Sequence, residues 1–295
     1  MLNSELKKMI VDLVRTAIAE DVGPGDVTSL GCLEPEKLKA GIFAKSEGIL
    51  SGSIPAQLTF ELVDSANVFR LRLKDGERFR PGDIIAEIEG LNQTMLAAER
   101  TALNFMAHLS GVATLTGRFV EKVSGTKCKI LDTRKTTPGW RYLEKAAVVH
   151  GGGENHRLGL FDMVLIKDNH IAAAGSISGA VKRMRAYLDS SDFRLQFKRK
   201  AENILIEVEI TSESELEEAL ACGIDRILLD NQTPENLTKL VQKARSIKAG
   251  IKLEASGNVN LDTVAAIAAS GVDYVSIGAL THSAPVSDFS MRVIS

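Results

Sequence analysis

The sequence lacks several features that would point to particular classes of protein. Its three cysteines, Cys32, Cys128 and Cys222, are far apart and form no CxxC pair, which argues against a zinc site and favours reduced thiols. The first residues carry charges where a signal peptide would need an apolar core, and no uncharged stretch is long enough to span a membrane. These absences predict a cytoplasmic protein with no membrane partner.

A charge imbalance and the common nucleotide motifs are also missing. The 36 basic and 38 acidic side chains leave a net charge of −2, so no general affinity for nucleic acid is expected. Neither GxxxxGK[ST] nor GxGxxG occurs, which disfavours a nucleoside triphosphate or a dinucleotide as ligand. The hydrophobic content of 44% and the length of 295 residues are those of a soluble globular protein with room for two domains.

The first third of the chain predicts a small α+β domain. Apolar residues from Leu6 to Ile18 recur at helical spacing, and strand-like alternation appears at Ala40–Ala44, Phe69–Leu73 and Ile84–Glu89. The rhythm of residues 74–90 resembles a biotinyl or lipoyl carrier hairpin, but no lysine stands at its tip as a carrier requires. Two helices, Gln93–His108 and about Gly111–Val123, are expected to follow and to link the domains.

The rest of the chain alternates between strands and helices. Strand-like runs begin near Lys129, Met163, Ile204, Arg226, Ile251 and Tyr274. Six such units in succession predict an incomplete, six-stranded α/β barrel. The expected fold class is therefore α/β, with an N-terminal α+β open-faced sandwich domain in residues 1–115 and a barrel domain in residues 116–283, and with a tail, about 284–295, that could return to the first domain.

Cations gather where two buried strands end. Asp132-Thr133-Arg134-Lys135 follows the first strand, Lys167-Asp168-Asn169-His170 follows the second, and Asn155-His156-Arg157 lies between them. Solvated loop charges would be the simplest explanation, but two such tetrads at equivalent strand ends weaken it. Because Arg and Lys suit carboxylate and phosphate, we expect a strongly anionic ligand. The run Lys198–Lys200, by contrast, is interpreted as a solvated connection.

Two further kinds of binding site are predicted at the same edge. Glu209 and Asp230 end adjacent strands and suit Mg²⁺ that carries substrate phosphate oxygens, although they could also be salt-bridge partners. Small residues that permit close backbone approach follow the last two strands, which favours a sugar phosphate; they are Ser256, Gly257, Asn258 and Gly278, with His282 nearby.

The stretch from Asp132 to Ile171, DTRKTTPGWRYLEKAAVVHGGGENHRLGLFDMVLIKDNHI, resembles the signature region of the quinolinate phosphoribosyltransferase family. EDVGPGDVT at residues 20–28 and ERTALN at residues 99–104 resemble two further elements of that family. The resemblance implies a type II phosphoribosyltransferase fold. It also implies Mg²⁺-dependent transfer of phosphoribosyl from phosphoribosyl diphosphate to quinolinate, which yields nicotinate mononucleotide, pyrophosphate and carbon dioxide for NAD biosynthesis.

The resemblance also implies roles for individual residues. Those that match the quinolinate side are Arg100 from a partner subunit, Arg134, Lys135, His156, Arg157 and Lys167. Glu209 and Asp230 match the metal and ribose side, and Lys135, Lys167, Glu209 and Asp230 form the catalytic set. The 5′-phosphate segments hold Ser256, Gly257, Asn258, Gly278 and His282. The family pattern implies a homodimer with shared sites, and it leaves open a higher oligomer and the role of the 189–200 linker.

Two other functions remain open at this point. A barrel lyase or aldolase could form an imine on Lys167, since a lysine at a strand end can serve as such a nucleophile. A binding protein of the same fold, as in relatives linked to molybdate transport, would have no catalytic role. The complete RKT, NHR and KDNH elements count against this second alternative.

Overall fold

The computed structural model describes residues 4–197 and 204–294. The chain divides into two compact units: the first comprises Met1–Gly117, Lys135–Gly153 and Ala279–Ser295, and the second Arg118–Arg134 and Glu154–Gly278. The basic run Lys198–Lys200 lies outside the described residues. Among the residues that are described, none of the helices is both long and apolar enough to cross a membrane.

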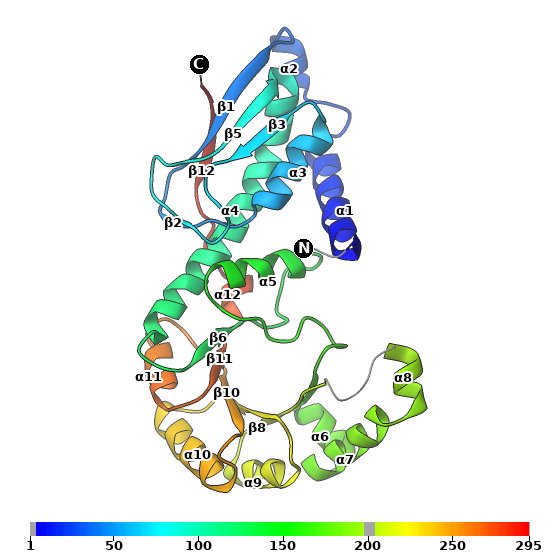
Figure 1. Cartoon of the computed structure of the whole chain (residues 1–295), viewed down its shortest axis with the longest axis vertical. Helices are drawn as coiled ribbons and strands as arrows, with labels where there is room; N and C mark the ends of the chain where they lie inside the picture. The colour runs from blue at the N-terminus through cyan, green and yellow to red at the C-terminus, as the bar shows by residue number, and fades with distance from the viewer. Residues whose placement is uncertain (1–3, 198–203, 295) are drawn as a thin grey trace. The chain divides into compact units, whose positions relative to one another are not determined.

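The first unit is built around an antiparallel sheet of four strands in the order β12-β1-β5-β3 (Figure 1). These strands are β1 (Lys37–Ala44), β3 (Val68–Leu71), β5 (Ile84–Leu91) and β12 (Phe289–Ile294). A smaller sheet pairs β2 (Gly48–Ile49) with β4 (Arg78–Phe79). The helices of this unit include α1 (Ser4–Asp21), α2 (Val27–Cys32), α3 (Ser53–Val63), α5 (Arg141–His150) and α12 (Ala279–His282).

Apolar side chains from the sheet and from two helices form the core of this unit. Ile42 on β1 and Ile88 on β5 are buried against Phe60 on α3 and Met106 on α4 (Asn92–Val123). Burying such side chains stabilises the fold by about 1.5 to 3 kcal/mol each. The last strand, β12, completes the sheet because it pairs antiparallel with β1, with Ile42 opposite Met291.

One continuous helix, α4 (Asn92–Val123), replaces the two helices that the sequence predicts on either side of Gly111. The predicted break was wrong because Gly111 serves packing and does not end the helix. A Cβ atom at this position would lie 2.1 Å from the carbonyl oxygen of Pro285. Glycine here therefore allows the C-terminal segment to approach the helix backbone closely.

The second unit contains a sheet of six parallel strands in the order β6-β11-β10-β9-β8-β7. The strands are β6 (Lys129–Leu131), β7 (Val164–Ile166), β8 (Ile206–Ile210), β9 (Arg226–Asp230), β10 (Lys252–Ser256) and β11 (Tyr274–Ser276). Because β6 and β7 are both edge strands, the barrel is open between its first and second strands. The prediction of an incomplete, six-stranded barrel is confirmed.

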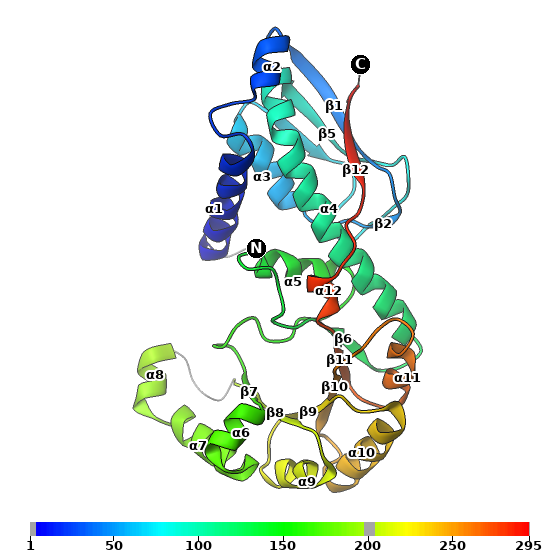
Figure 2. The ribbon, with the colours of Figure 1, turned by 180° about the vertical axis from the view of Figure 1, so that it is seen from behind.

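Helices cover the outer face of this curved sheet. They are α6 (Asp168–Ala174), α7 (Ile177–Leu188), α9 (Glu213–Ala221), α10 (Pro234–Ile247) and α11 (Val264–Ala269). Helix α8 (Ser191–Phe197) follows α7 and packs against it, away from the strands. In Figures 1 and 2, α9, α10 and α11 follow one another along the outside of the strands. Local sequence fixes where they begin: Ser212 and Glu215 form a capping box at α9, and Thr233 caps α10 ahead of Pro234.

Candidate active site

The inner face of the parallel sheet is polar. Register pairs Glu207 with Arg226, and places both Glu209 and Glu254 opposite Leu228. Because side chains alternate along a strand, these residues share one face, while buried residues such as Val208 point to the other. Within the described sheet, carboxylates and a guanidinium are therefore enclosed inside the open barrel.

The segment that carries His156 runs along the open edge of β6. Leu131 forms a parallel bridge with Glu154, and the Glu154 backbone N–H donates to the Ile130 carbonyl at 2.8 Å. The His156 backbone N–H then donates to Asp132 Oδ1 at 2.9 Å, and Asp132 is fully buried. These bonds explain why a loop residue reaches the interior of the barrel.

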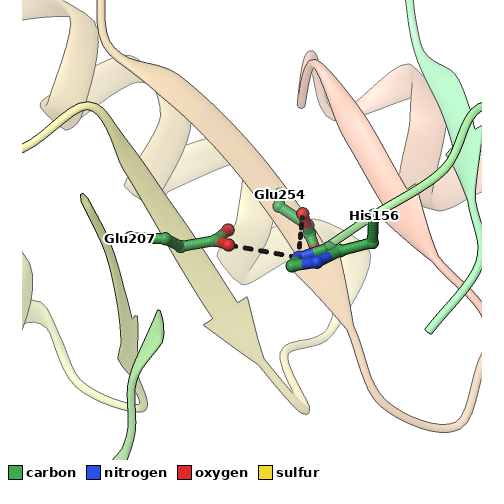
Figure 3. Close-up of side chains that lie close together, drawn as sticks. All are labelled: His156, Glu207 and Glu254. Atoms are coloured by element: carbon green, nitrogen blue, oxygen red, sulfur yellow. Dashed lines mark ion pairs between the residues drawn. The ribbon is translucent and has the colours of Figure 1, made fainter. Parts of the chain in front are cut away.

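Figure 3 shows the imidazole of His156 between two carboxylates, Glu207 from β8 and Glu254 from β10. Its Nε2 lies 3.1 Å from Glu207 Oε2 and 3.4 Å from Glu254 Oε2. Both glutamates are fully buried. Nδ1 of the ring lies 2.7 Å from the backbone nitrogen of Arg157, so Nε2 is the nitrogen that faces the two carboxylates.

Protonation in this cluster is strongly perturbed. Burial alone would lower the pKa of His156, but the two carboxylates outweigh it and raise that pKa to about 9. For Glu207, burial and the neighbouring Glu254 raise the pKa to about 7. Burial also acts to raise the pKa of Glu254, yet the hydrogen bond from His156 leaves it lowered. The group thus holds one proton tightly on His156 or shares it with Glu207.

The ligand atoms of His156, Glu207 and Glu254 lie within 4.8 Å of one another, which is close enough for a metal ion. A guanidinium already supplies positive charge there: Arg226 Nη1 is 3.2 Å from Glu254 Oε2, and the same guanidinium lies 4.2 Å above the ring of Tyr274. Arg226 thus balances negative charge of the buried carboxylates. We therefore interpret it as a buried support for His156.

Sequence reasoning missed the roles of Glu207 and Glu254. A usable signal existed in the alternation of β8, where Glu207 and Glu209 occupy every second position between Ile206, Val208 and Ile210. Two acids on the same face of a buried strand require a partner or a ligand. The sequence could not predict that His156 is the partner of Glu207 and Glu254, because His156 lies on a loop that is distant from both strands in the chain.

Three cations of the predicted pocket, Arg134, Arg157 and Lys167, interact with charged neighbours in the second unit. Burial lowers the pKa of Arg157 and the Arg134 guanidinium lowers it further, while the carboxylates of Glu207, Asp162 and Glu209 act to raise it. Lys167 at the end of β7 forms an ion pair with Glu209 at the end of β8. Two guanidiniums that act on each other repel, and an anionic ligand bound to both would lower this repulsion.

His170 plays a structural part. Its Nδ1 accepts the backbone N–H of Lys167 at 3.0 Å, and its own backbone N–H donates to the Lys167 carbonyl at 2.8 Å. The side chain thus caps the first turn of α6. In the KDNH tetrad, Lys167 is the residue whose side chain forms an ion pair with the adjacent strand, through Glu209 on β8.

Three of the predicted residues, Arg100, Lys135 and His282, belong to the first unit. Arg100 is exposed on α4. The Lys135 carbonyl accepts a hydrogen bond at 2.8 Å from Thr281, which is buried on α12. His282 is exposed and lies 2.6 Å from the hydroxyl of Ser283.

A buried acid holds the loop that follows Lys135. Glu144 on α5 is fully buried. It accepts the Thr137 backbone N–H at 3.0 Å and lies 2.8 Å from His108 Nε2. Nearby, the Trp140 ring stacks on Phe105 with centroids 4.7 Å apart. Residues 135–140 are therefore fixed by two contacts, the hydrogen bond from the Thr137 backbone to Glu144 and the stacking of Trp140 on Phe105.

The strand ends of β9 and β10 bring Asp230 next to the segment Ser256–Asn258. The Asn231 backbone N–H donates to the Ser256 carbonyl at 2.8 Å. Gly257 has a φ of 98°, and a Cβ there would lie 2.1 Å from Asn231 Oδ1. Gly278 ends the second unit directly before α12. Glu209 and Asp230 share a face on adjacent strands, but each has its own partner, Lys167 and Asn231 respectively.

A cavity of about 480 Å³ lies at the opposite, amino ends of β10 and β11, where its lining includes Lys127, Arg245, Gly250 and Asp273. Asp273 already pairs with Arg245 and with Lys252. In α/β barrels, ligands bind at the carboxyl ends of the strands. We therefore place the functional site at the edge that holds Arg134, Lys167 and Asp230.

The open parallel barrel, with guanidiniums, ammonium groups and carboxylates at its carboxyl edge, defines an α/β-barrel protein built to hold anionic ligands. A model of the quinolinate phosphoribosyl transferase C-terminal domain matches residues 112–292, and that of the N-terminal domain matches residues 26–110. The chain belongs to the quinolinate phosphoribosyltransferase family.

Individual relatives agree along nearly the whole length. A Bacillus subtilis protein that carries the name probable nicotinate-nucleotide pyrophosphorylase (carboxylating) is 42% identical over 289 residues, which are 98% of this chain and 93% of the relative. The nicotinate-nucleotide pyrophosphorylase (carboxylating) of Mycobacterium leprae is 39% identical and covers 95% of both chains. The solved structure of the nicotinate-nucleotide pyrophosphorylase from Francisella tularensis superposes with a TM-score of 0.88 at 37% identity, covering 97% of this chain and 96% of the other.

Proposed function

We propose that this chain performs the reaction for which its family is named, the transfer of phosphoribosyl from phosphoribosyl diphosphate to quinolinate with loss of carbon dioxide. The products are nicotinate mononucleotide, pyrophosphate and carbon dioxide, on the route to NAD. The observation that carries the proposal is the match of the chain to both domains of the family, over residues 26–110 and 112–292. Arg134 and Arg157, two of the proposed quinolinate ligands, influence each other electrostatically in the second unit.

On the acceptor side, the two carboxylates of quinolinate call for several fixed cations. Arg134, Arg157 and Lys167 supply them within the second unit, and Lys135 follows Arg134 directly in the chain. Guanidiniums bind carboxylates through two parallel hydrogen bonds, so they fix orientation as well as charge. His156, held by Glu207 and Glu254, adds a buried N–H group to this side.

On the donor side, Glu209 and Asp230 fit Mg²⁺ by their donor chemistry. Both are partly exposed carboxylates on one face of adjacent strands, and Mg²⁺ takes one or two carboxylates together with substrate phosphates. When bound, the ion would neutralise negative charge on the departing pyrophosphate. The segments around Ser256, Gly257, Asn258, Gly278 and His282 are proposed to hold the 5′-phosphate.

The chemistry then needs no nucleophilic side chain. The ring nitrogen of quinolinate attacks the ribose carbon as the bond to pyrophosphate breaks. When the C2 carboxylate then leaves as carbon dioxide, the electron pair stays at C2, where the adjacent pyridinium nitrogen stabilises it, and a proton from solvent completes the C–H bond. Catalysis rests on positioning and on preorganised charge. Lys135, Lys167, Glu209 and Asp230 are the residues proposed to act on the reacting groups.

We further propose that the working form is a cytoplasmic homodimer in which Arg100 of one subunit completes the site of the other. Arg100 is exposed on α4 and is therefore accessible to a partner. A two-fold dimer would give two equivalent shared sites.

The competing lyase chemistry on Lys167 finds less support. An amine attacks a carbonyl through its free electron pair, whereas the Lys167 amino group is engaged in an ion pair with Glu209. Release of labelled carbon dioxide from carboxyl-labelled quinolinate tests the proposal directly. The expected result is release that requires both phosphoribosyl diphosphate and Mg²⁺, and release that is independent of phosphoribosyl diphosphate would overturn it.

A further inference from the structure

Two backbone positions at the carboxyl edge of the barrel are conformationally unusual. Among the described residues, Asn231 (φ 52°) and Asn258 (φ 50°) are the non-glycine residues with positive φ. Asn231 directly follows β9, and Asn258 lies two residues beyond β10. Left-handed backbone costs free energy for a residue with a side chain, and such positions concentrate at functional sites.

Hydrogen bonds join these two residues to the proposed metal ligand. Asn231 Nδ2 donates to Asp230 Oδ2 at 2.7 Å, and Asn258 Nδ2 donates to Asn231 Oδ1 at 3.4 Å. The Asn231 backbone N–H donates to the Ser256 carbonyl at 2.8 Å. The result is a chain of contacts from the carboxylate of Asp230 to the segment Ser256–Asn258.

Close packing makes this arrangement specific. The side chain of Asn231 lies against the α-carbon of Gly257, where a Cβ would be 2.1 Å from Oδ1 and 2.6 Å from Cγ of Asn231. Gly257 itself has a φ of 98°. The space occupied by the Asn231 amide therefore exists only because residue 257 has no side chain.

We propose that Asn231 is a positioning residue that orients the Asp230 carboxylate and couples it to the 5′-phosphate segment Ser256–Asn258. This inference rests on the proposed function, since it assigns one end of phosphoribosyl diphosphate to each partner of Asn231. When the 5′-phosphate binds, it holds the segment Ser256–Asn258 in place, and this segment in turn holds the side-chain amide of Asn231. The amide then fixes the orientation of the Asp230 carboxylate toward the metal and pyrophosphate. The two ends of the donor substrate then bind cooperatively, and the coupling is reciprocal.

Asn231→Gly separates this role from a purely structural one. Glycine keeps the left-handed backbone without strain and removes only the amide. The first readout is the affinity of Mn²⁺, used as a paramagnetic substitute for Mg²⁺, measured by electron paramagnetic resonance with phosphoribosyl diphosphate present. The second readout is the ratio of two affinities for Mn²⁺, both measured in the presence of pyrophosphate, one with and one without ribose 5-phosphate.

Asn231→Gly is expected to weaken Mn²⁺ binding roughly tenfold, because a hydrogen bond to a charged group is lost, and to abolish the effect of ribose 5-phosphate. The affinity for quinolinate should stay unchanged. Asn258→Gly, which keeps the direct contact of Asn231 with Asp230, should reduce only the coupling. Gln242→Ala, at an exposed position on α10, is the control and should behave as wild type.

Wild-type Mn²⁺ affinity and wild-type coupling in Asn231→Gly would overturn the inference. So would an equal loss of affinity for quinolinate, since it would show that the amide only maintains the fold. The proposed function fails separately, if the wild-type protein binds Mn²⁺ and phosphoribosyl diphosphate but releases no carbon dioxide from quinolinate. In that case the binding measurements still decide the role of Asn231.

Discussion

At the scale of single residues, Arg134 carries the most direct prediction. Arg134→Ala removes a positioned guanidinium beside Arg157, so carbon dioxide release should fall about a hundredfold or more, equivalent to roughly 2 to 4 kcal/mol of transition-state stabilisation. The free energy of unfolding should change little. Arg183→Ala, at an exposed position on α7, is the matched control, and near-normal turnover of folded Arg134→Ala would contradict the assignment.

His156 should make stability depend on pH. Its pKa is about 9 in the folded protein against an ordinary value of 6.5, so folding favours the protonated ring. That contribution is fully present below about pH 6.5 and is lost as pH rises through 9. We expect the free energy of unfolding of the wild type to fall by about 2 to 3 kcal/mol over this range.

Urea denaturation at stepped pH measures this effect, with His156→Gln as the comparison. The variant should be less stable at pH 6 and should show a flatter dependence toward pH 9. Parallel pH profiles for the two proteins would mean that the carboxylates of Glu207 and Glu254 do not hold the proton on His156.

Residue types at strand ends were predictable because charge after a buried strand is conspicuous in a sequence. Arg134 and Lys167 were predicted this way, and Arg157 was predicted from the loop between them; Arg134 and Arg157 influence each other electrostatically. The contacts behind them were not predictable. Glu254 on β10 forms an ion pair with His156, which lies on a loop beside β6. This contact depends on the register of the strands and on the path of the loop, and neither can be predicted from the sequence.

At the scale of elements, α5 is predicted to hold the loop that carries Lys135. Glu144→Ala removes the acceptor of the Thr137 N–H and the partner of His108. Since it leaves buried polar groups unpaired, it should lower the free energy of unfolding by about 3 kcal/mol. Tryptic cleavage after Arg134 and Lys135 should also become faster.

Mass spectrometry of the fragments measures this local opening separately from global stability. Glu61→Gln, at an exposed position on α3, is the control. If cleavage at other sites accelerates as much as cleavage after Lys135, the helix supports the whole unit and has no special hold on the loop.

Elements were predicted well where periodicity is clear. The six strands of the barrel and the helix α5 appear within a few residues of their predicted starts. The break at Gly111 was predicted wrongly because glycine weakens a helix and also permits close packing. Only the tertiary contact with Pro285 distinguishes these two uses.

At the scale of the whole molecule, the shared-site proposal predicts complementation between inactive subunits. Arg100→Ala and Lys135→Ala homodimers should each be nearly inactive. After equal mixing, unfolding and reassembly, about half of the dimers are hybrids, and each hybrid has one site with both residues intact. Activity should recover to roughly a quarter of wild type. Confirmed subunit exchange without recovery would show that Arg100 acts within its own chain.

The pairing of β12 with β1 has a consequence for synthesis on the ribosome. Strand β5 is complete at Leu91, but β12 begins only at Phe289. At about 5 to 20 residues per second, one edge of β1 waits unpaired for roughly 10 to 40 s. An open strand edge is a site for pairing with other chains. The N-terminal sheet is therefore synthesised first but is completed only when the C-terminal strand β12 has been made. A ribosome that stalls before β12 would release a chain whose strand β1 has an unpaired edge that can aggregate.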